Sequence, residues 1–493
     1  MKISIDKSSK VPVYLQIADQ IKAQIISGAL PRLSALPSER ALAQILDVHR
    51  NTVVKAYGEL KSDAWIESRQ GVGYLVASAS TEKEPVGESG EGVQMGRVNW
   101  VNEVADKYLD MEKTFDDLFQ RFTDESHFSL GSGIASREVY SSERVAHDIA
   151  GLLTGSGPSQ YFFSPYKGDR FLRQKLASFL GTKGVRASSG ETQILSETNQ
   201  ALDFIVTLLV KPGDSVVMEE PVHPDMYRVM ELAGARILTV PVDEDGMNCD
   251  VLESLLTQTR PRLIFVNSSF HDPTGCILSL ERRKKLVELS SRYRIPIVEE
   301  DAASELVYDG DKLPPIKAFD TTGNVIYIYS FSLTFIPGLS LAFVTGNRDF
   351  VRALSYLVSV RLMASDWMTQ KLLGMYLDDG SYYSSLATFR EIYSGNRDLV
   401  CQKLDALAHL GVRYERPRGG VYVWCRLPDG VDSKHFINRA YNMGVTLIPG
   451  HVFYPYKNGG RDYIRINYSY ESRERLACGM DVLHKALEEE LEE

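Results

Sequence analysis

The first 77 residues carry a pattern of apolar and polar positions that predicts three helices and a hairpin. Apolar residues recur at helical spacing over residues 14–28, between a proline at the start and a glycine at the stop. Further helices are expected over residues 38–46, where a serine can cap the first turn, and over residues 49–62. Residues 65–77 read as two short strands around a glycine-containing turn. Together these elements predict a winged helix-turn-helix domain.

The third of these helices has distinct apolar and polar faces. Its apolar stripe consists of Val53, Ala56, Tyr57 and Leu60. Burying that stripe turns Asn51, Lys55 and Ser62 outward. The outward face is therefore the one that can meet a partner.

The rest of the chain predicts a linker followed by a large α/β body. Residues 78–98 are rich in Gly, Ser and Glu and are expected to be a flexible linker. A helix should follow, with an apolar face made by Trp100, Val101, Val104, Tyr108 and Met111. Strands and helices then alternate from Phe128 onward, and residues 324–347 predict two buried strands joined by a serine-rich connection. We expect domains at 1–77 and 99–493, with a small C-terminal α/β part from about residue 388.

Composition narrows the class of protein. The 493 residues are 44% hydrophobic and 24% charged, which suits two or three domains with a large core. Five cysteines are scattered without a Cys-x-x-Cys pair, which argues against a disulfide framework and a structural zinc site, and no metal site is expected. No apolar signal segment or membrane-length run is present. We expect a cytoplasmic protein with no membrane partner.

Charge is distributed unevenly along the chain. Residues 1–77 contain ten Lys and Arg against seven Asp and Glu, so this part carries +3 while the whole chain carries −10. The N-terminal part is therefore the one suited to a polyanion. Its segments PVYLQIADQI, LPSERALA, VHRNTVVKAYGEL and RQGVGYLVA resemble the DNA-binding domain of the GntR family of transcription regulators.

This resemblance implies double-stranded DNA as a partner. A recognition helix places its N-terminal residues against base edges, whereas flanking basic groups contact phosphates. We expect bases to be read by His49, Arg50, Asn51 and Thr52. Lys55 and Arg40 are expected at phosphates, and the wing tip is expected to be formed by Arg69, Gly71 and Gly73.

The body resembles fold-type I aminotransferases, in the version carried by the MocR branch of the GntR family. The resemblance rests on the segments LVKPGDSVVMEEPVHP, HDPTG, IPIVEED and NVIYIYSFSLTFIPGLSLAFVTGN. It implies a homodimer, because such domains build their pockets at a subunit interface. It also implies a pyridoxal phosphate site, formed in the family around a Schiff-base lysine.

Position by position, the family's cofactor residues are replaced. Leu333 stands at the lysine, Ser340 at the phosphate-binding arginine, Glu197 at a phosphate-cup glycine and Ala302 at a tyrosine facing the ring. A carboxylate about 4 Å from a phosphate charge costs on the order of 4 kcal/mol at an effective dielectric near 20. We therefore expect pyridoxal phosphate not to bind in the usual way.

Four other positions are expected to line an effector pocket. Glu300 takes the place of the family's pyridine-binding aspartate, although an alignment shifted by one would offer Asp301. His223 stands at a ring-stacking aromatic position, and Asp272 at an asparagine. Arg465 matches the arginine that grips the substrate carboxylate, or it forms a structural salt bridge.

These residues favour a one-component regulator that senses an amino acid or other carboxylate without transaminase chemistry. A pyridoxal phosphate-dependent aminotransferase, a pyridoxal phosphate-sensing regulator and a ligand-independent regulator that only dimerises through its body are the alternatives. Leu333 argues against the enzyme, and Arg465 argues for an effector.

Overall fold

The computed structural model divides the chain into two compact units, Met1–Val98 and Asn99–Glu493. It describes residues 3, 5, 12–26, 30–31, 34–46, 48–62, 65–69, 73–76, 121, 126–136, 138–155, 165–362, 366–456 and 458–492. The linker expected at 78–98 and the helix expected from Trp100 lie outside these residues. No helix in the described ranges is long and apolar enough to cross a bilayer.

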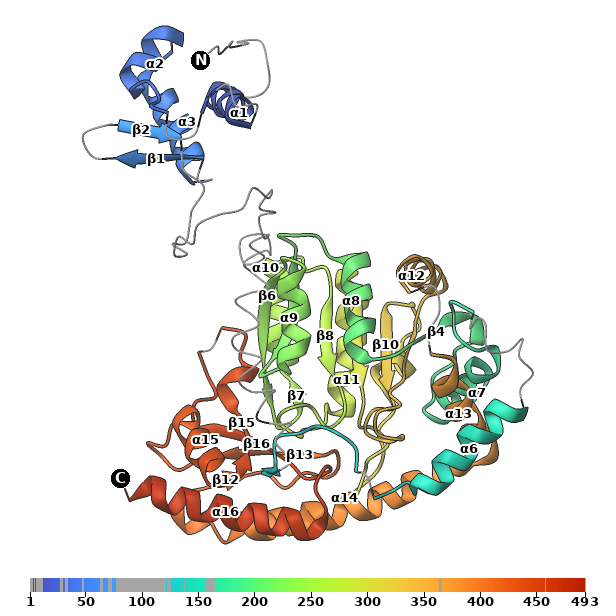
Figure 1. The fold of residues 1–493 in the computed structure, drawn as a ribbon. Helices are drawn as coiled ribbons and strands as arrows, with labels where there is room; N and C mark the ends of the chain where they lie inside the picture. The colour runs from blue at the N-terminus through green and yellow to red at the C-terminus, as the bar shows by residue number, and fades with distance from the viewer. Residues whose placement is uncertain are drawn as a thin grey trace, which may run out of the picture. The chain divides into compact units, whose positions relative to one another are not determined.

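The N-terminal unit is a winged helix-turn-helix, as the sequence predicted. Its elements are α1 (Val13–Ile26), α2 (Glu39–Leu46), α3 (Arg50–Ser62), β1 (Ile66–Arg69) and β2 (Gly73–Val76), with the two strands antiparallel (Figure 1). Ser38 Oγ accepts a hydrogen bond from Ala41 N at 3.2 Å, and His49 Nδ1 accepts one from Asn51 N at 3.2 Å. Both helix starts are thus capped by the side chain of the preceding residue.

The expected apolar stripe of α3 is the centre of this small core. Val53, Ala56, Tyr57 and Leu60 are fully buried, against Ile17 and Ile21 of α1 and Leu42 of α2 among others. The buried Tyr57 hydroxyl donates a hydrogen bond to Pro37 O at 2.8 Å. The face of α3 that carries Asn51 and Lys55 is left exposed.

The C-terminal unit is built on an eight-stranded sheet. Its strand order is β4-β11-β10-β9-β8-β5-β6-β7, parallel from β10 to β6 and antiparallel at both edges. The strands are β4 (Thr192–Leu195), β5 (Ser215–Glu220), β6 (Arg236–Asp243), β7 (Gly246–Met247), β8 (Ile264–Asn267), β9 (Ile297–Asp301), β10 (Val325–Ser330) and β11 (Ala342–Thr345). Every residue of β10 and β11 is buried, which confirms the two strands expected within 324–347.

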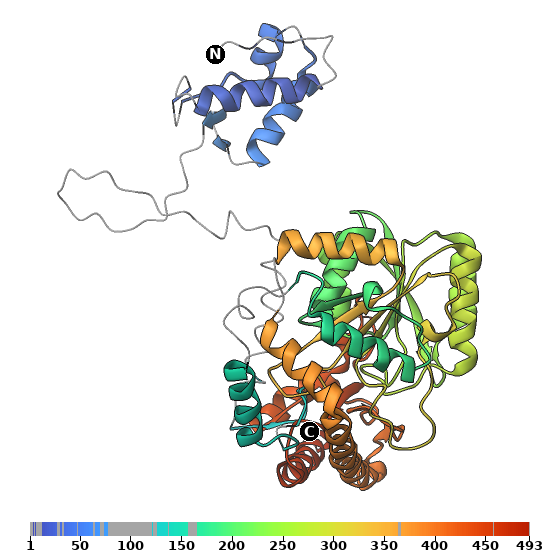
Figure 2. The same cartoon turned by 90° about the vertical axis from the view of Figure 1, so that its right-hand side faces the viewer.

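Helices cover both faces of this sheet (Figures 1 and 2). One face packs against α8 (Thr198–Leu209), α9 (Pro224–Leu232) and α12 (Arg348–Arg361). The other packs against α10 (Cys249–Gln258) and α11 (Leu280–Tyr293), and farther along against α7 (Arg170–Thr182) and α13 (Trp367–Asp379). Successive strand residues point to opposite faces, so Val298 faces the first group of helices and Ile297 faces the second.

The smaller C-terminal part has an antiparallel sheet of order β12-β13-β16-β15. Its strands are β12 (Arg413–Tyr414), β13 (Tyr422–Arg426), β15 (Ile448–Pro449) and β16 (Tyr463–Asn467), with β14 (Val445–Thr446) paired separately to β3 (Phe128–Ser129). The long helix α14 (Ser381–Asp405) packs beside α16 (Arg473–Leu491), and α15 (Ser433–Asn442) packs against α16 as well (Figure 1). Helix α6 (Ser142–Gly155) packs against α13. Helix α14 runs unbroken through residue 388, where the small part was expected to begin.

Candidate functional site

The outward face of α3 presents the residues expected to read DNA bases. His49, Arg50 and Asn51 are exposed at the start of the helix, and Thr52 is half-buried behind them. Lys55 lies one turn farther along, also exposed. The structure therefore gathers His49, Arg50, Asn51 and Thr52 at the N-terminal end of α3, the end that enters the major groove in such domains. Asn51 and Lys55, four residues apart, share one exposed face.

Among the described residues, Arg50 is the one of these five that forms an ion pair. Its Nη2 lies 2.9 Å from Glu39 Oε2, and the Tyr74 hydroxyl donates to Glu39 Oε1 at 3.1 Å. Burial of the Tyr74 hydroxyl, followed by its hydrogen bond to Glu39, raises the pKa of Tyr74. Glu39 thus ties α2, α3 and β2 together through Arg50 and Tyr74.

The remaining expected contacts sit on α2 and the hairpin. Arg40 is exposed on α2, and Gly73 begins β2 with φ near 97°, a left-handed conformation that favours glycine. Arg69 ends β1. Gly71 lies outside the described residues.

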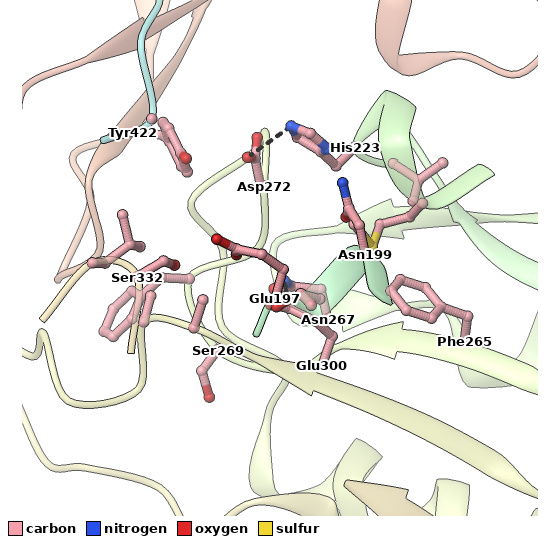
Figure 3. A pocket seen from close by; sticks show the side chains of 18 residues that line it. Glu197, Asn199, His223, Phe265, Asn267, Ser269, Asp272, Glu300, Ser332 and Tyr422 are labelled. Atoms are coloured by element: carbon pink, nitrogen blue, oxygen red, sulfur yellow. Dashed lines mark hydrogen bonds and ion pairs between the residues drawn. The ribbon is translucent and has the colours of Figure 1, made fainter. Parts of the chain in front are cut away.

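A cavity of ≈ 270 Å³ lies in the C-terminal unit at the carboxyl ends of the parallel strands. Strands β8 and β9 deliver Asn267 and Glu300 to it, and the N-termini of α8 and α9 deliver Glu197 and His223 (Figure 3). Ligands of open α/β sheets bind at this edge because the strand ends and helix starts converge there. This cavity is the strongest candidate for a small-molecule site.

Glu197 occupies the N-cap position of α8 but does not cap the helix with its side chain. Its carboxylate makes no hydrogen bond or ion pair to any described residue and reaches toward the middle of the cavity in Figure 3. A helix N-terminus normally favours anions through its free N–H groups and dipole. Here a fixed negative charge already stands at that position.

Asp272 and Arg465 form a buried ion pair at the wall of the cavity. Arg465 Nη1 lies 2.7 Å from both carboxylate oxygens of Asp272, and Nη2 donates to Gly131 O at 2.8 Å. The Arg465 guanidinium also lies over the Tyr422 ring, 4.3 Å from its centroid. Burial would raise the pKa of Asp272, but Arg465, aided by His223, outweighs it and holds this pKa below its usual value.

This pairing changes the expectation for Arg465. Asp272 lines the cavity, whereas Arg465 is only 2% exposed and stands behind it. The Arg465 Nη groups are held by Asp272 and Gly131, and its Nε is buried without a hydrogen-bond partner among the described residues. The structural salt bridge, which the sequence left open as an alternative, is present, and its partner is Asp272.

Glu300, rather than Asp301, faces the cavity. Strand alternation sends the two side chains to opposite faces of β9, and the Tyr327 hydroxyl donates to Asp301 Oδ2 at 2.5 Å on the far face. Glu300 accepts a hydrogen bond from Asn267 Nδ2. Burial, followed by the charges of Asp301 and Asp272, raises the pKa of Glu300 to about 8.

The other expected positions are divided between the cavity and its surroundings. Leu333 and Ala302 line the wall, and His223 Nε2 lies 3.9 Å from Asp272 Oδ2. Ser340 does not line the cavity, and its buried Oγ has no hydrogen-bond partner among the described residues. None of the described residues that line the cavity is Lys or Arg.

Sequence reasoning missed several lining residues. Asn267, Phe265 and Phe270 come from β8 and the turn after it, and Tyr422 comes from β13. Asn267 could have been found, because it is the last residue of an apolar strand at the same sheet edge as Glu300. Tyr422 could not, since its strand belongs to the small sheet and its approach depends on tertiary packing.

A buried lysine was also missed, on the far face of β9. Lys183 Nζ donates to Ser304 Oγ at 2.6 Å and pairs with Glu305 Oε1 at 2.6 Å, with Asp301 Oδ2 at 3.7 Å. Its side chain is fully buried. These partners hold the amine away from the cavity.

Two sequence families match the chain. Residues 125–481 match the family described as aminotransferase class I and II, and residues 13–76 match the bacterial regulatory proteins of the gntR family.

In the part that the structure describes, no group of three or more His, Cys, Asp or Glu residues is placed to hold a metal ion.

Individual relatives fall into regulators and enzymes. The uncharacterized HTH-type transcriptional regulator YisV of Bacillus subtilis is 27% identical over 96% of both chains. The probable rhizopine catabolism regulatory protein MocR of Rhizobium meliloti is 28% identical over 90% of this chain and 88% of its own. Among solved structures, a multiple substrate aminotransferase from Thermococcus profundus superposes with a TM-score of 0.75 at 27% identity, covering 80% of this chain and all of that one.

Proposed function

Because the chain belongs to the aminotransferase class I and II family and carries a GntR-family domain, the arrangement of MocR-type regulators, we propose a DNA-binding transcription regulator that senses a small molecule without transaminase chemistry. DNA is bound by residues 1–77, through the exposed face of α3 and the hairpin. The body binds the effector in the cavity around Glu300 and joins two copies of the chain.

The residues of the cavity do not fit pyridoxal phosphate. The family's anchor is a lysine amine, and the aligned residue, Leu333, offers only an apolar wall. A phosphate group would have to bind at the start of α8, beside the unpaired Glu197 carboxylate. Ser340, aligned with the phosphate-binding arginine, carries no charge. The single observation that carries the proposal is this lining, in which Leu333 stands at the position of the amine, no described lining residue is Lys or Arg, and the Glu197 carboxylate stands at the start of α8 where the phosphate would bind.

Arg465 gives weaker support for a carboxylate effector than the sequence suggested. Its guanidinium holds Asp272 and Gly131, so a ligand carboxylate competes with an internal one. The effector class is better inferred from the groups that face the cavity directly.

The likeness to a multiple substrate aminotransferase keeps a working enzyme as the second candidate. The two candidates differ in one assay. Purified full-length protein, supplied with pyridoxal phosphate, is incubated with amino acids and keto acids, and amino-group transfer is measured. The regulator predicts no turnover above the rate of free cofactor, whereas sustained transfer would establish the enzyme.

DNA binding is tested with the full-length protein on a random-sequence duplex pool at low salt. Repeated selection should enrich a specific sequence, because α3 presents base-reading side chains and basic neighbours. Failure to retain any duplex, in protein that remains folded, would remove the regulator.

A further inference from the structure

The groups that face the cavity are predominantly acidic. Glu197, Asp272 and Glu300 bring carboxyl groups to it, and His223 is the one basic side chain among the described lining residues. Arg465 compensates only Asp272, because its Nη groups are used by that carboxylate and by Gly131 O. Glu197 and Glu300 are left without a cationic partner among the described residues.

Glu300 is the buried carboxyl group of this acidic lining. It is 7% exposed, and Asn267 is the only described residue that hydrogen-bonds its side chain, through one of the two oxygens. No described residue hydrogen-bonds the other oxygen, Oε1, and Glu300 lines the cavity (Figure 3). A buried carboxyl with a free acceptor is costly unless a donor reaches it, which a ligand can do.

The walls suit an organic cation better than a metal ion. Phe265, Phe270 and Tyr422 line the cavity with aromatic surface, and Leu333 and Met226 add apolar surface. Aromatic rings attract ammonium groups through their quadrupoles and shelter the attached methylene groups. The volume, ≈ 270 Å³, equals roughly nine water molecules at about 30 Å³ each, enough for a compact aliphatic molecule.

We infer that this cavity binds a small aliphatic amine, with an ammonium group held between Glu197 and Glu300 and its methylene chain against the aromatic walls. The inference rests on the proposed function, since it names the chemical class of the effector. It explains why Arg465 is internally neutralised: an unpaired guanidinium at the wall would repel the same ligand.

The pH dependence of binding follows from the ionisation of Glu300. Titratable and charged neighbours on the sheets are Asp301 and Glu299 on its own strand, Asp272 after β8, Glu219 on β5 and Tyr422 on β13. Glu197 at the start of α8 and His223 at the start of α9 face the same cavity. The acidic neighbours favour the protonated form, while an ammonium group favours the ionised one. Amine binding should therefore release a proton from Glu300 and should tighten as pH rises from about 6 to about 8.

Calorimetry on the full-length protein tests the inference without DNA. The probes are diaminopropane, diaminobutane and diaminopentane, with butanediol as the neutral match, succinate as the anionic match, and pyridoxal phosphate. At least one diamine should bind about tenfold or more tighter than butanediol and succinate. Glu197→Gln and Glu300→Gln should each weaken that diamine about tenfold, whereas Glu244→Gln, an exposed acid away from the cavity, should not.

Three results would overturn the inference: no diamine binding, tighter binding of succinate or pyridoxal phosphate, or diamine binding unchanged in both cavity variants. Glu197 is exposed, so its variant remains informative even where Glu300→Gln disturbs folding. Since the readout involves no DNA, a protein that binds diamines but no duplex would refute the regulator alone. A protein that binds duplex but no diamine would refute the amine alone.

Discussion

At the scale of single residues, the wall of the cavity depends on side-chain pairs that join distant parts of the chain. Asp272 and Arg465 are 193 residues apart, and Arg465 Nη1 lies 2.7 Å from the Asp272 carboxylate. The sequence left a structural salt bridge open for Arg465 but did not identify Asp272 as its partner. Strand alternation puts Glu300 and Asp301 on opposite faces of β9. Which of the two faces the cavity depends on how the sheet is packed. Side-chain partners of this kind depend on tertiary packing, which periodicity does not encode.

The Asp272–Arg465 pair should be important for stability. Removing Arg465 leaves a mostly buried carboxylate without its cation, so Arg465→Ala should lower the free energy of unfolding by about 3–5 kcal/mol. Urea denaturation of the single variant and of Asp272→Asn/Arg465→Met measures this. A double variant as unstable as the single one would show that the pairing is not the cause.

Glu300 should make stability depend on pH in the opposite sense to a salt-bridged acid. Its pKa is about 8 in the folded protein against an ordinary value of 4.5, so between these values the unfolded chain has released a proton that the folded one retains. The free energy of unfolding should fall as pH rises through this range, by up to about 1.4 kcal/mol per pH unit. Glu300→Gln should remove that part of the slope, and an unchanged slope would contradict the burial of an ionisable group here.

Two residues of α3 should have separable effects on DNA binding. Lys55→Ala should weaken binding to all duplexes and reduce the salt dependence by about one counterion, whereas Asn51→Ala should cost about 1–3 kcal/mol and relax base preference. Titrations over a range of salt, on specific and random duplexes, distinguish the two. Identical behaviour of both variants would mean that α3 does not lie in the groove as expected.

At the scale of elements, the sequence predicted much of what the structure shows. The three N-terminal helices, the hairpin and the strands β10 and β11 lie where apolar spacing placed them. Strand order, the pairing of β14 with β3 and the unbroken course of α14 could not be predicted, because they depend on contacts between distant segments. The start of α8 is an example of both outcomes. The alternation of strands and helices predicted a helix, but only the structure shows that the Glu197 side chain does not cap it.

The connection from β10 to β11 and the start of α8 should together determine cofactor binding. Leu333→Lys alone should not produce tight pyridoxal phosphate binding, because Glu197 and the uncharged Ser340 still disfavour the phosphate. Adding Glu197→Gly and Ser340→Arg should restore it. Absorption titration measures the affinity of both variants for pyridoxal phosphate. Tight binding by the single variant would show that Glu197 and Ser340 do not prevent the phosphate from binding.

At the scale of the whole molecule, the chain combines an N-terminal domain, residues 1–77, that carries +3 with a larger acidic remainder that carries −13. The structure separates Met1–Val98 from Asn99–Glu493. Each unit has its own core, so sequence patterns were sufficient to identify both. How an occupied cavity alters DNA binding depends on contacts that neither pattern nor composition specifies.

We expect two copies of the chain to associate. Paired DNA half-sites require two recognition helices, and the family's pockets lie at a subunit interface. Light scattering at micromolar concentration should give about twice the 55.2 kDa mass of the chain. A monomer would contradict this expectation.

The account depends most on the claim that the cavity works without pyridoxal phosphate. The direct measurement is the visible absorption spectrum of the purified protein, before and after saturation with pyridoxal phosphate and treatment with borohydride. We predict a colourless protein, no protein-bound visible band on addition, and no lysine adduct trapped by borohydride. A yellow protein whose visible band disappears with borohydride, leaving a modified lysine, would contradict the account.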